Sequence, residues 1–179
     1  MKTVYFDSGG KQHTEETLKI AKEYADEKKI KDIVVASTYG YTAEKAAEVF
    51  SDKNLIVVTH VTGFSHEDEQ QFSEKIREKL EAKGVKFVTA AHAFGGINRA
   101  VEDSPGKIIA DTLRMFCQGV KVAVEIALEA ADAGLVSTKK DIVSIAGTGK
   151  GADTVLVIKP STSRNVFDLR VKKLLAKPL

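Results

Sequence analysis

The chain has 179 residues, of which 43% are hydrophobic and 29% are charged. These proportions predict one domain over residues 1–179, with a packed core inside a charged surface. Lys and Arg number 27 against 25 Asp and Glu, the formal charge is +2, and the two signs are interleaved. Without a basic block or arginine–aromatic clusters, the composition argues against nucleic acid as a partner.

The cysteine and histidine content argues against a disulfide framework and against a metal site. Cys117 is the single cysteine, and the four histidines form no HxxxH pair. No apolar run approaches the ~18 residues that a membrane-spanning helix needs. The chain enters a strand-like run at Thr3 with no signal-peptide pattern. We therefore expect a cytoplasmic protein with no membrane partner.

Strand-like and helix-like segments alternate along the chain. Short β-branched runs predict strands, whereas apolar residues at helical spacing, N-cap residues and Gly C-caps predict helices. The predicted elements are a strand at 4–6, a helix at 14–29 with Thr14 as N-cap, a strand at 33–36, a helix at 42–50, a strand at 55–59, a helix at 67–82, a strand at 85–89, helices at 106–117 and 119–133 (or one helix bent near Gly119), strands at 142–146 and 155–158, and a short strand at 165–167. This alternation implies right-handed crossovers and a parallel sheet with helices on both faces.

The loops that leave the predicted strands differ in composition from the loops that enter them. Entering loops are short and charged, whereas leaving loops are rich in Gly, Thr, Ser, His and aromatic residues and lie at 37–42, 60–65, 91–96 and 147–151. Ligands of open α/β sheets bind at the carboxyl ends of strands. The pattern favours a small-molecule site at that edge over the alternative, in which these residues only form turns and caps.

The loop at 37–42 carries the clearest sign of phosphate binding. It leaves a buried strand and opens a helix at Thr42, where free backbone N–H groups and the positive end of the helix dipole favour an anion. Gly40 allows close approach of the backbone, and the hydroxyls of Ser37, Thr38 and Thr42 can donate to phosphate oxygens. The alternative is that Thr42 only caps the helix.

The loop at 147–151 contains Gly147, Thr148, Gly149, Lys150 and Gly151, and it partly matches a dinucleotide-binding fingerprint. The context does not fit, because a strand rather than a helix follows at Val155. We expect a hairpin-like or crossover connection whose lysine or free N–H groups face a ligand. A plain flexible turn is the alternative.

The loops after the strands at 55–59 and 85–89 add histidines and aromatic rings. We assign His60, Thr62 and Gly63 to the site, and His60 or His92 is a candidate acid–base group near neutral pH. A structural role for either histidine is equally open, so no catalytic residue is assigned. Four aromatic residues have two open roles, as walls for a flat ring or as lids on the core: Tyr39, Tyr41, Phe64 and Phe94.

Two further residues are assigned more loosely. Cys117 has apolar neighbours at helical spacing and is expected in the core. Asp153 follows the glycine loop, and its carboxylate is expected to bind either a polyol hydroxyl of a ligand or the backbone.

The order of these motifs resembles the C-terminal domain of pyruvate kinase. The resemblance rests on the strand, turn and helix of residues 33–43, the strand at 55–59, and the two strands at 140–147 and 154–158 that flank the glycine loop. It implies a three-layer α/β/α sandwich whose sheet is mainly parallel and whose last strand is antiparallel. It also implies phosphate binding at the turn of residues 37–42. No segment resembles the catalytic barrel, so pyruvate kinase activity is not expected.

The resemblance is stronger to the stand-alone archaeal proteins of this superfamily, which are associated with flavin mononucleotide (FMN). Tyr41 stands where the kinase turn usually carries Arg or Lys, which argues against a sugar bisphosphate. The resemblance therefore implies FMN as cofactor, a small-molecule ligand as partner and self-association into a homo-oligomer. Three functions stay open: a flavoprotein with a redox role, a non-catalytic sensor of another phosphorylated metabolite, and a hydrolase or transferase acting through His60 or His92.

Overall fold

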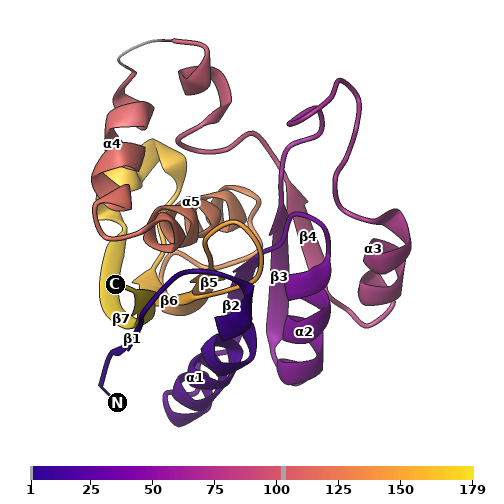
Figure 1. Cartoon of the computed structure of the whole chain (residues 1–179), viewed down its shortest axis with the longest axis vertical. Coiled ribbons are helices and arrows are strands. Elements are labelled where there is room, and N and C mark those ends of the chain that lie inside the picture. The colour runs from indigo at the N-terminus through magenta and orange to yellow at the C-terminus, as the bar shows by residue number, and fades with distance from the viewer. Residues whose placement is uncertain (1, 102–103) are drawn as a thin grey trace.

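The computed structural model describes residues 2–101 and 104–179. Within them, a seven-stranded sheet has the order β1-β7-β6-β5-β2-β3-β4 and carries helices on both faces (Figure 1). Its strands are β1 (Val4–Phe6), β2 (Asp32–Ala36), β3 (Asn54–Thr59), β4 (Lys86–Thr89), β5 (Ile142–Ala146), β6 (Thr154–Lys159) and β7 (Arg170–Pro178). Strand β6 is antiparallel to its neighbours β5 and β7, and the other neighbouring strands are parallel. The predicted α/β/α class, with a mainly parallel sheet, is therefore confirmed.

Each face of the sheet is covered by its own set of helices. The first face carries α1 (Thr14–Glu27), α2 (Tyr41–Val49) and α3 (Glu74–Glu81), and the second carries α4 (Pro105–Arg114) and α5 (Gln118–Asp132). Neighbouring side chains of β2 alternate between the two cores: Ile33 and Val35 pack in the first, and Val34 packs in the second. A strand buried on both faces reads as a continuous β-branched run, which is why β2 could be predicted from sequence.

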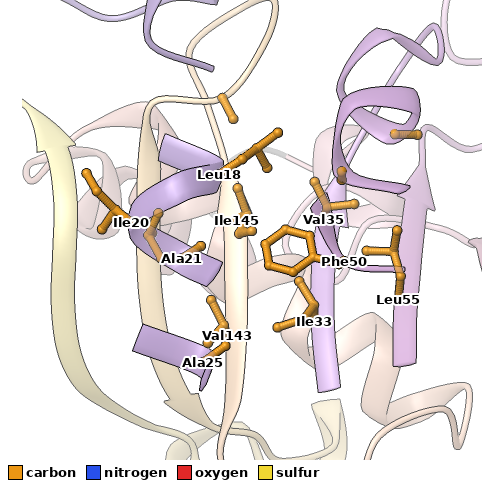
Figure 2. Close-up of a cluster of buried hydrophobic side chains, with 14 of the residues drawn as sticks. Leu18, Ile20, Ala21, Ala25, Ile33, Val35, Phe50, Leu55, Val143 and Ile145 are labelled. Carbon is orange, nitrogen blue, oxygen red and sulfur yellow. The ribbon is translucent and has the colours of Figure 1, made fainter. Parts of the chain in front are cut away.

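The first core joins strands from the centre of the sheet to α1 and α2. In Figure 2, Phe50 at the end of α2 lies among Ile33 and Val35 of β2 and Ile145 of β5. Phe50 is 1% exposed and the three strand residues are fully buried. This packing anchors α2, so its first residues are held at the carboxyl edge of the sheet.

Helices α4 and α5 are separate and are joined at residues 115–117. Cys117 is extended, with φ 174°, and its Sγ accepts the Val120 N–H, so it caps α5. It is half-buried beside the second core rather than inside it. Gly119 lies where α5 crosses β6, because a Cβ there would stand 2.0 Å from the Thr154 Oγ1.

The predicted helix at 67–82 is too long. Helix α3 begins at Glu74, and the residues before it form turns. Asp68 has φ 60°, a left-handed conformation that no helix interior accepts. The Gln70 Oε1 also accepts the Phe72 N–H at 2.9 Å, so a side chain replaces a helical carbonyl there.

The C-terminal prediction is also wrong. Residues 163–168 form a 3-10 segment instead of a strand, and β7 follows between β6 and β1. The sequence signal of β7 is weak because lysines interrupt it. Its first four residues are exposed, and its most deeply buried residues, Leu175 and Ala176, come only near its end. The final strand is thus added beyond the segment that resembles pyruvate kinase.

Across residues 2–101 and 104–179, no helix is both long enough and apolar enough to cross a membrane.

Candidate functional site

The carboxyl edge of the sheet contains a cleft of about 480 Å³. Its lining includes the end of β2 and β3, the loops after β2, β3, β4 and β5, and the inner sides of α4 and α5. Because α2 and α5 lie on opposite faces of the sheet, the cleft has one wall from each helical layer. This volume falls within the range of about 300–1,000 Å³ that is typical of small-molecule sites.

The turn between β2 and α2 brings anion-binding groups to the cleft. Ser37, Thr38, Tyr41 and Thr42 all line it. The Ser37 Oγ accepts the Ala43 N–H at 3.3 Å, so Ser37, not Thr42, provides the side-chain cap. The backbone N–H groups of Tyr41 and Thr42 have no acceptor within the described residues. They stand at the positive end of α2, where an anion is favoured.

Gly40 shapes this turn without lining the cleft. Its φ is 110°, in the left-handed region that favours glycine. A Cβ at this position would also stand 2.7 Å from the Cδ1 of Ile76 on α3. Glycine therefore permits both the turn and the packing of α3 behind it.

The segment between β1 and α1 supports the turn of residues 37–42, a role that the sequence did not suggest. The ammonium of Lys11 lies 4.3 Å from the centroid of the Tyr41 ring. A positive charge therefore stands beside the turn although position 41 itself is uncharged. Cation–π contact of this kind also holds the lysine near the ring.

Asp153 fastens this segment to the loop after β5. Its Oδ2 accepts the N–H groups of Gly10, at 2.8 Å, and Thr148, at 2.9 Å, and its Oδ1 accepts the Thr154 hydroxyl at 2.7 Å. The carboxylate thus binds the backbone, which was one of the two predicted roles. Thr14 has a similar role and is not the N-cap of α1: it donates to the Lys11 carbonyl and accepts from a backbone N–H of the same loop.

The loop at 147–151 is the connection of an antiparallel strand pair, the hairpin-like form of the two connections that its context left open. Gly147, Gly149, Lys150 and Gly151 line the cleft, and Thr148 does not. Strand β6 follows the loop and pairs with β5, so no helix opens there to hold a dinucleotide. Lys150 is exposed and places a positive charge at the cleft.

His60 lines the cleft within a cluster of rings. Its centroid lies 4.1 Å from that of Phe64 and 5.2 Å from that of His92. The Gln71 Oε1 lies 2.8 Å from the His60 Nδ1, whereas the Gln71 Nε2 points to two hydroxyl oxygens. Because Nδ1 faces an amide oxygen, Nδ1 is the ring nitrogen that donates. The other ring nitrogen, Nε2, lies 3.4 Å from the Thr38 hydroxyl.

Two predicted site residues lie away from the cleft. Thr62 and Gly63 are exposed and do not line it. Thr62 accepts a hydrogen bond from Gln70, and the Gly63 N–H donates to the carbonyl of Glu69. Both residues therefore shape the excursion between β3 and α3. Tyr39, Phe64, His92 and Phe94 do line the cleft.

Helices α4 and α5 contribute polar residues that sequence reasoning missed. On α4, Asp111 pairs with Lys107 at 2.9 Å and with Arg114 at 2.6 Å. On α5, Lys121, Glu125 and Glu129 all line the cleft. Along the chain, these six side chains lie between the loop at 91–96 and the loop at 147–151.

The three charged residues of α5 form a buried stripe, with exposures of 6%, 4% and 4% for Lys121, Glu125 and Glu129. Lys121 pairs with Glu125, whose other oxygen accepts the Phe94 N–H at 2.9 Å. The Glu129 Oε1 accepts the Ala93 N–H at 3.2 Å, and its Oε2 has no partner within the described residues. Charged residues four apart in an otherwise apolar helix were the available sequence signal.

Glu129 is the residue whose protonation the site changes most clearly. Burial, followed by the negative charge of Glu125, raises the pKa of Glu129 from 4.5 to about 8. The Ala93 N–H and Lys121 act in the opposite direction but do not cancel the effect of burial. At neutral pH the carboxyl is therefore mainly uncharged.

In residues 2–101 and 104–179, no group of three or more His, Cys, Asp or Glu side chains is arranged to hold a metal ion. The cleft presents hydroxyls, carboxyl groups, lysines and rings.

Two comparisons relate this chain to known proteins. The family model of the pyruvate kinase alpha/beta domain matches residues 15–158. Among solved structures, a pyruvate kinase from Cryptosporidium parvum is similar, with 14% identity and a TM-score of 0.42 over 80% of this chain. The match spans 22% of that enzyme. On the extent of the family match, this chain belongs to the pyruvate kinase alpha/beta domain family.

Proposed function

We propose that this chain binds a phosphate-bearing small molecule in the cleft and that FMN is its ligand. The observation that carries the proposal is the turn of residues 37–42, where two unpartnered backbone N–H groups and the Thr38 hydroxyl meet at the start of α2. Such a helix N-terminus is a ready anion site. Lys11 adds positive charge beside the turn, and Lys150 adds a positive charge at the cleft.

The remainder of the cleft supports a ligand with a flat ring. Rings from three loops line it, at Tyr39, His60, Phe64, His92 and Phe94. FMN combines a phosphate, a ribityl chain and a flat ring, and these parts correspond to the turn, the polar loops and the ring cluster. Stacking and apolar contact with the rings supply affinity, whereas the phosphate contacts fix orientation.

The test is direct titration of the purified protein with FMN and with riboflavin, which lacks the phosphate. Flavin fluorescence and the visible absorption spectrum report binding. We expect FMN to bind at least about tenfold more tightly than riboflavin, since a charge-assisted phosphate contact contributes about 1.5–3 kcal/mol. Equal binding of the two would remove the phosphate from the proposal, and no binding of either would reject FMN.

A matched pair of variants locates the phosphate. Thr38→Val removes a hydroxyl that lines the cleft, and Thr62→Val removes an exposed hydroxyl outside it. We expect only Thr38→Val to weaken FMN binding, with riboflavin affected little by either substitution. If FMN does not bind but another phosphorylated metabolite raises the melting temperature, the chain is a sensor for that metabolite instead.

A further inference from the structure

The buried stripe of α5 contains a carboxyl group that folding alone leaves unsatisfied. Glu129 is 4% exposed and lines the cleft, and its Oε2 has no hydrogen-bond partner within the described residues. Buried polar atoms are paired in nearly all native structures, so an unpaired one at a ligand-sized cleft needs an explanation. The missing partner is expected to come from whatever fills the cleft.

The charges within the stripe indicate the protonation state of this carboxyl group. Lys121 and Glu125 form one ion pair, and no second cation contacts Glu129 among the described residues. An unpaired buried carboxylate is costly, so Glu129 is held protonated. Its raised pKa, about 8, agrees with this assignment.

Hydrogen bonding then decides which oxygen carries the proton. The Oε1 accepts the Ala93 N–H at 3.2 Å, which makes it the carbonyl oxygen of the acid. The Oε2 is therefore the hydroxyl, and its O–H requires an acceptor. Because Ala93 lies between His92 and Phe94, which both line the cleft, the Glu129 carboxyl group is held beside the loop that carries these two rings.

We propose that Glu129 is a ligand-binding residue whose Oε2 hydroxyl donates a hydrogen bond to an acceptor atom on the ring of the bound ligand, a proposal that rests on the function proposed above. Carbonyl oxygens and imine nitrogens are the acceptors that fit such a donor, and the FMN ring carries both. The cleft would thus recognise the phosphate from α2 and the polar edge of the ring from α5.

The test compares donor-containing and donor-free side chains at position 129. Glu129→Gln keeps an N–H donor and Glu129→Met does not, with Glu129→Leu as a second donor-free variant. Glu78→Leu, at an exposed position of α3 outside the cleft, is the control. Dissociation constants are measured for FMN and for ribose 5-phosphate, which has the phosphate and sugar but no ring, and circular dichroism checks folding.

We expect the donor-free variants to bind FMN about five- to tenfold more weakly, as the loss of one buried hydrogen bond predicts. Glu129→Gln and Glu78→Leu should stay within about twofold of wild type, and the affinity for ribose 5-phosphate should not change in any variant.

Two outcomes would overturn the proposal while leaving the proposed function intact. One is wild-type FMN affinity in a folded donor-free variant. The other is an equal loss of affinity for ribose 5-phosphate, which would indicate a distorted cleft and not a lost ring contact. A wild-type protein that binds no FMN would instead reject the proposed function, and this inference with it.

Discussion

Ionisation of Glu129 predicts that the protein loses stability as the pH rises through neutrality. The pKa of this carboxyl is about 8 in the folded protein against an ordinary 4.5, because it is buried beside Glu125 with Asp132 also nearby. Between these two values the folded state holds a proton that the unfolded state releases. The free energy of unfolding therefore falls with rising pH, by about 1.4 kcal/mol per pH unit.

The size of the effect follows from the two pKa values. Between about pH 5 and pH 7.5, integration gives a loss of about 3 kcal/mol from Glu129 alone, and the loss ends above the folded pKa of about 8. Against a total stability of about 5–15 kcal/mol for a typical domain, this is a large share.

Urea unfolding of the wild type and of Glu129→Gln over that pH range measures the contribution. Glutamine keeps an acceptor for the Ala93 N–H but cannot ionise. Contributions from groups that the two proteins share cancel in the difference between them. We expect Glu129→Gln to gain about 3 kcal/mol relative to wild type as the pH rises. A difference that stays constant with pH would show that Glu129 ionises normally and would refute the reasoning.

Three further substitutions test contacts that hold the site in place, with the free energy of unfolding measured in urea. Gly40→Ala should lower that free energy by about 1–2 kcal/mol more than Gly134→Ala, since both glycines have positive φ but only Gly40 meets a side chain of α3. Equal losses would contradict the packing argument. Asp153→Ala should cost about 2–4 kcal/mol, because it removes the acceptor of two backbone N–H groups, and a change below about 1 kcal/mol would show that water replaces it. Lys121→Met should cost about 3 kcal/mol by leaving a buried carboxylate unpaired, and adding Glu125→Gln should restore most of that loss; no recovery would place the cost in packing instead.

Local sequence was sufficient for the central sheet and for the position of the turn at residues 37–42. Strand β2 is a β-branched run buried on both faces, and its carboxyl end meets Ser37 and Gly40 immediately along the chain. Both signals lie within a few residues, so no knowledge of distant contacts was needed. The prediction that a strand and not a helix follows the glycine loop was made in the same way.

Prediction failed where a side chain or a distant strand decided the structure. Residues 67–73 have helical composition, yet Asp68 and Gln70 turn the chain before α3. Strand β7 is stabilised by pairing with β6 and β1, at opposite ends of the sequence, which its own lysine-rich pattern does not reveal. Tertiary context overrode local propensity in both segments.

The sequence by itself determined the fold class, the edge of the sheet that carries the loops, and the chemistry of the Ser37–Thr42 turn, because each depends on residues adjacent along the chain. Only the tertiary structure decided what stands opposite that turn. Helix α5 crosses the second face of the sheet and brings Lys121, Glu125 and Glu129 to the same cleft, from about 80 residues further along the chain. A periodic pattern can indicate that a helix has a polar stripe, but the packing of that helix on the sheet decides whether the stripe faces solvent, the core or a ligand.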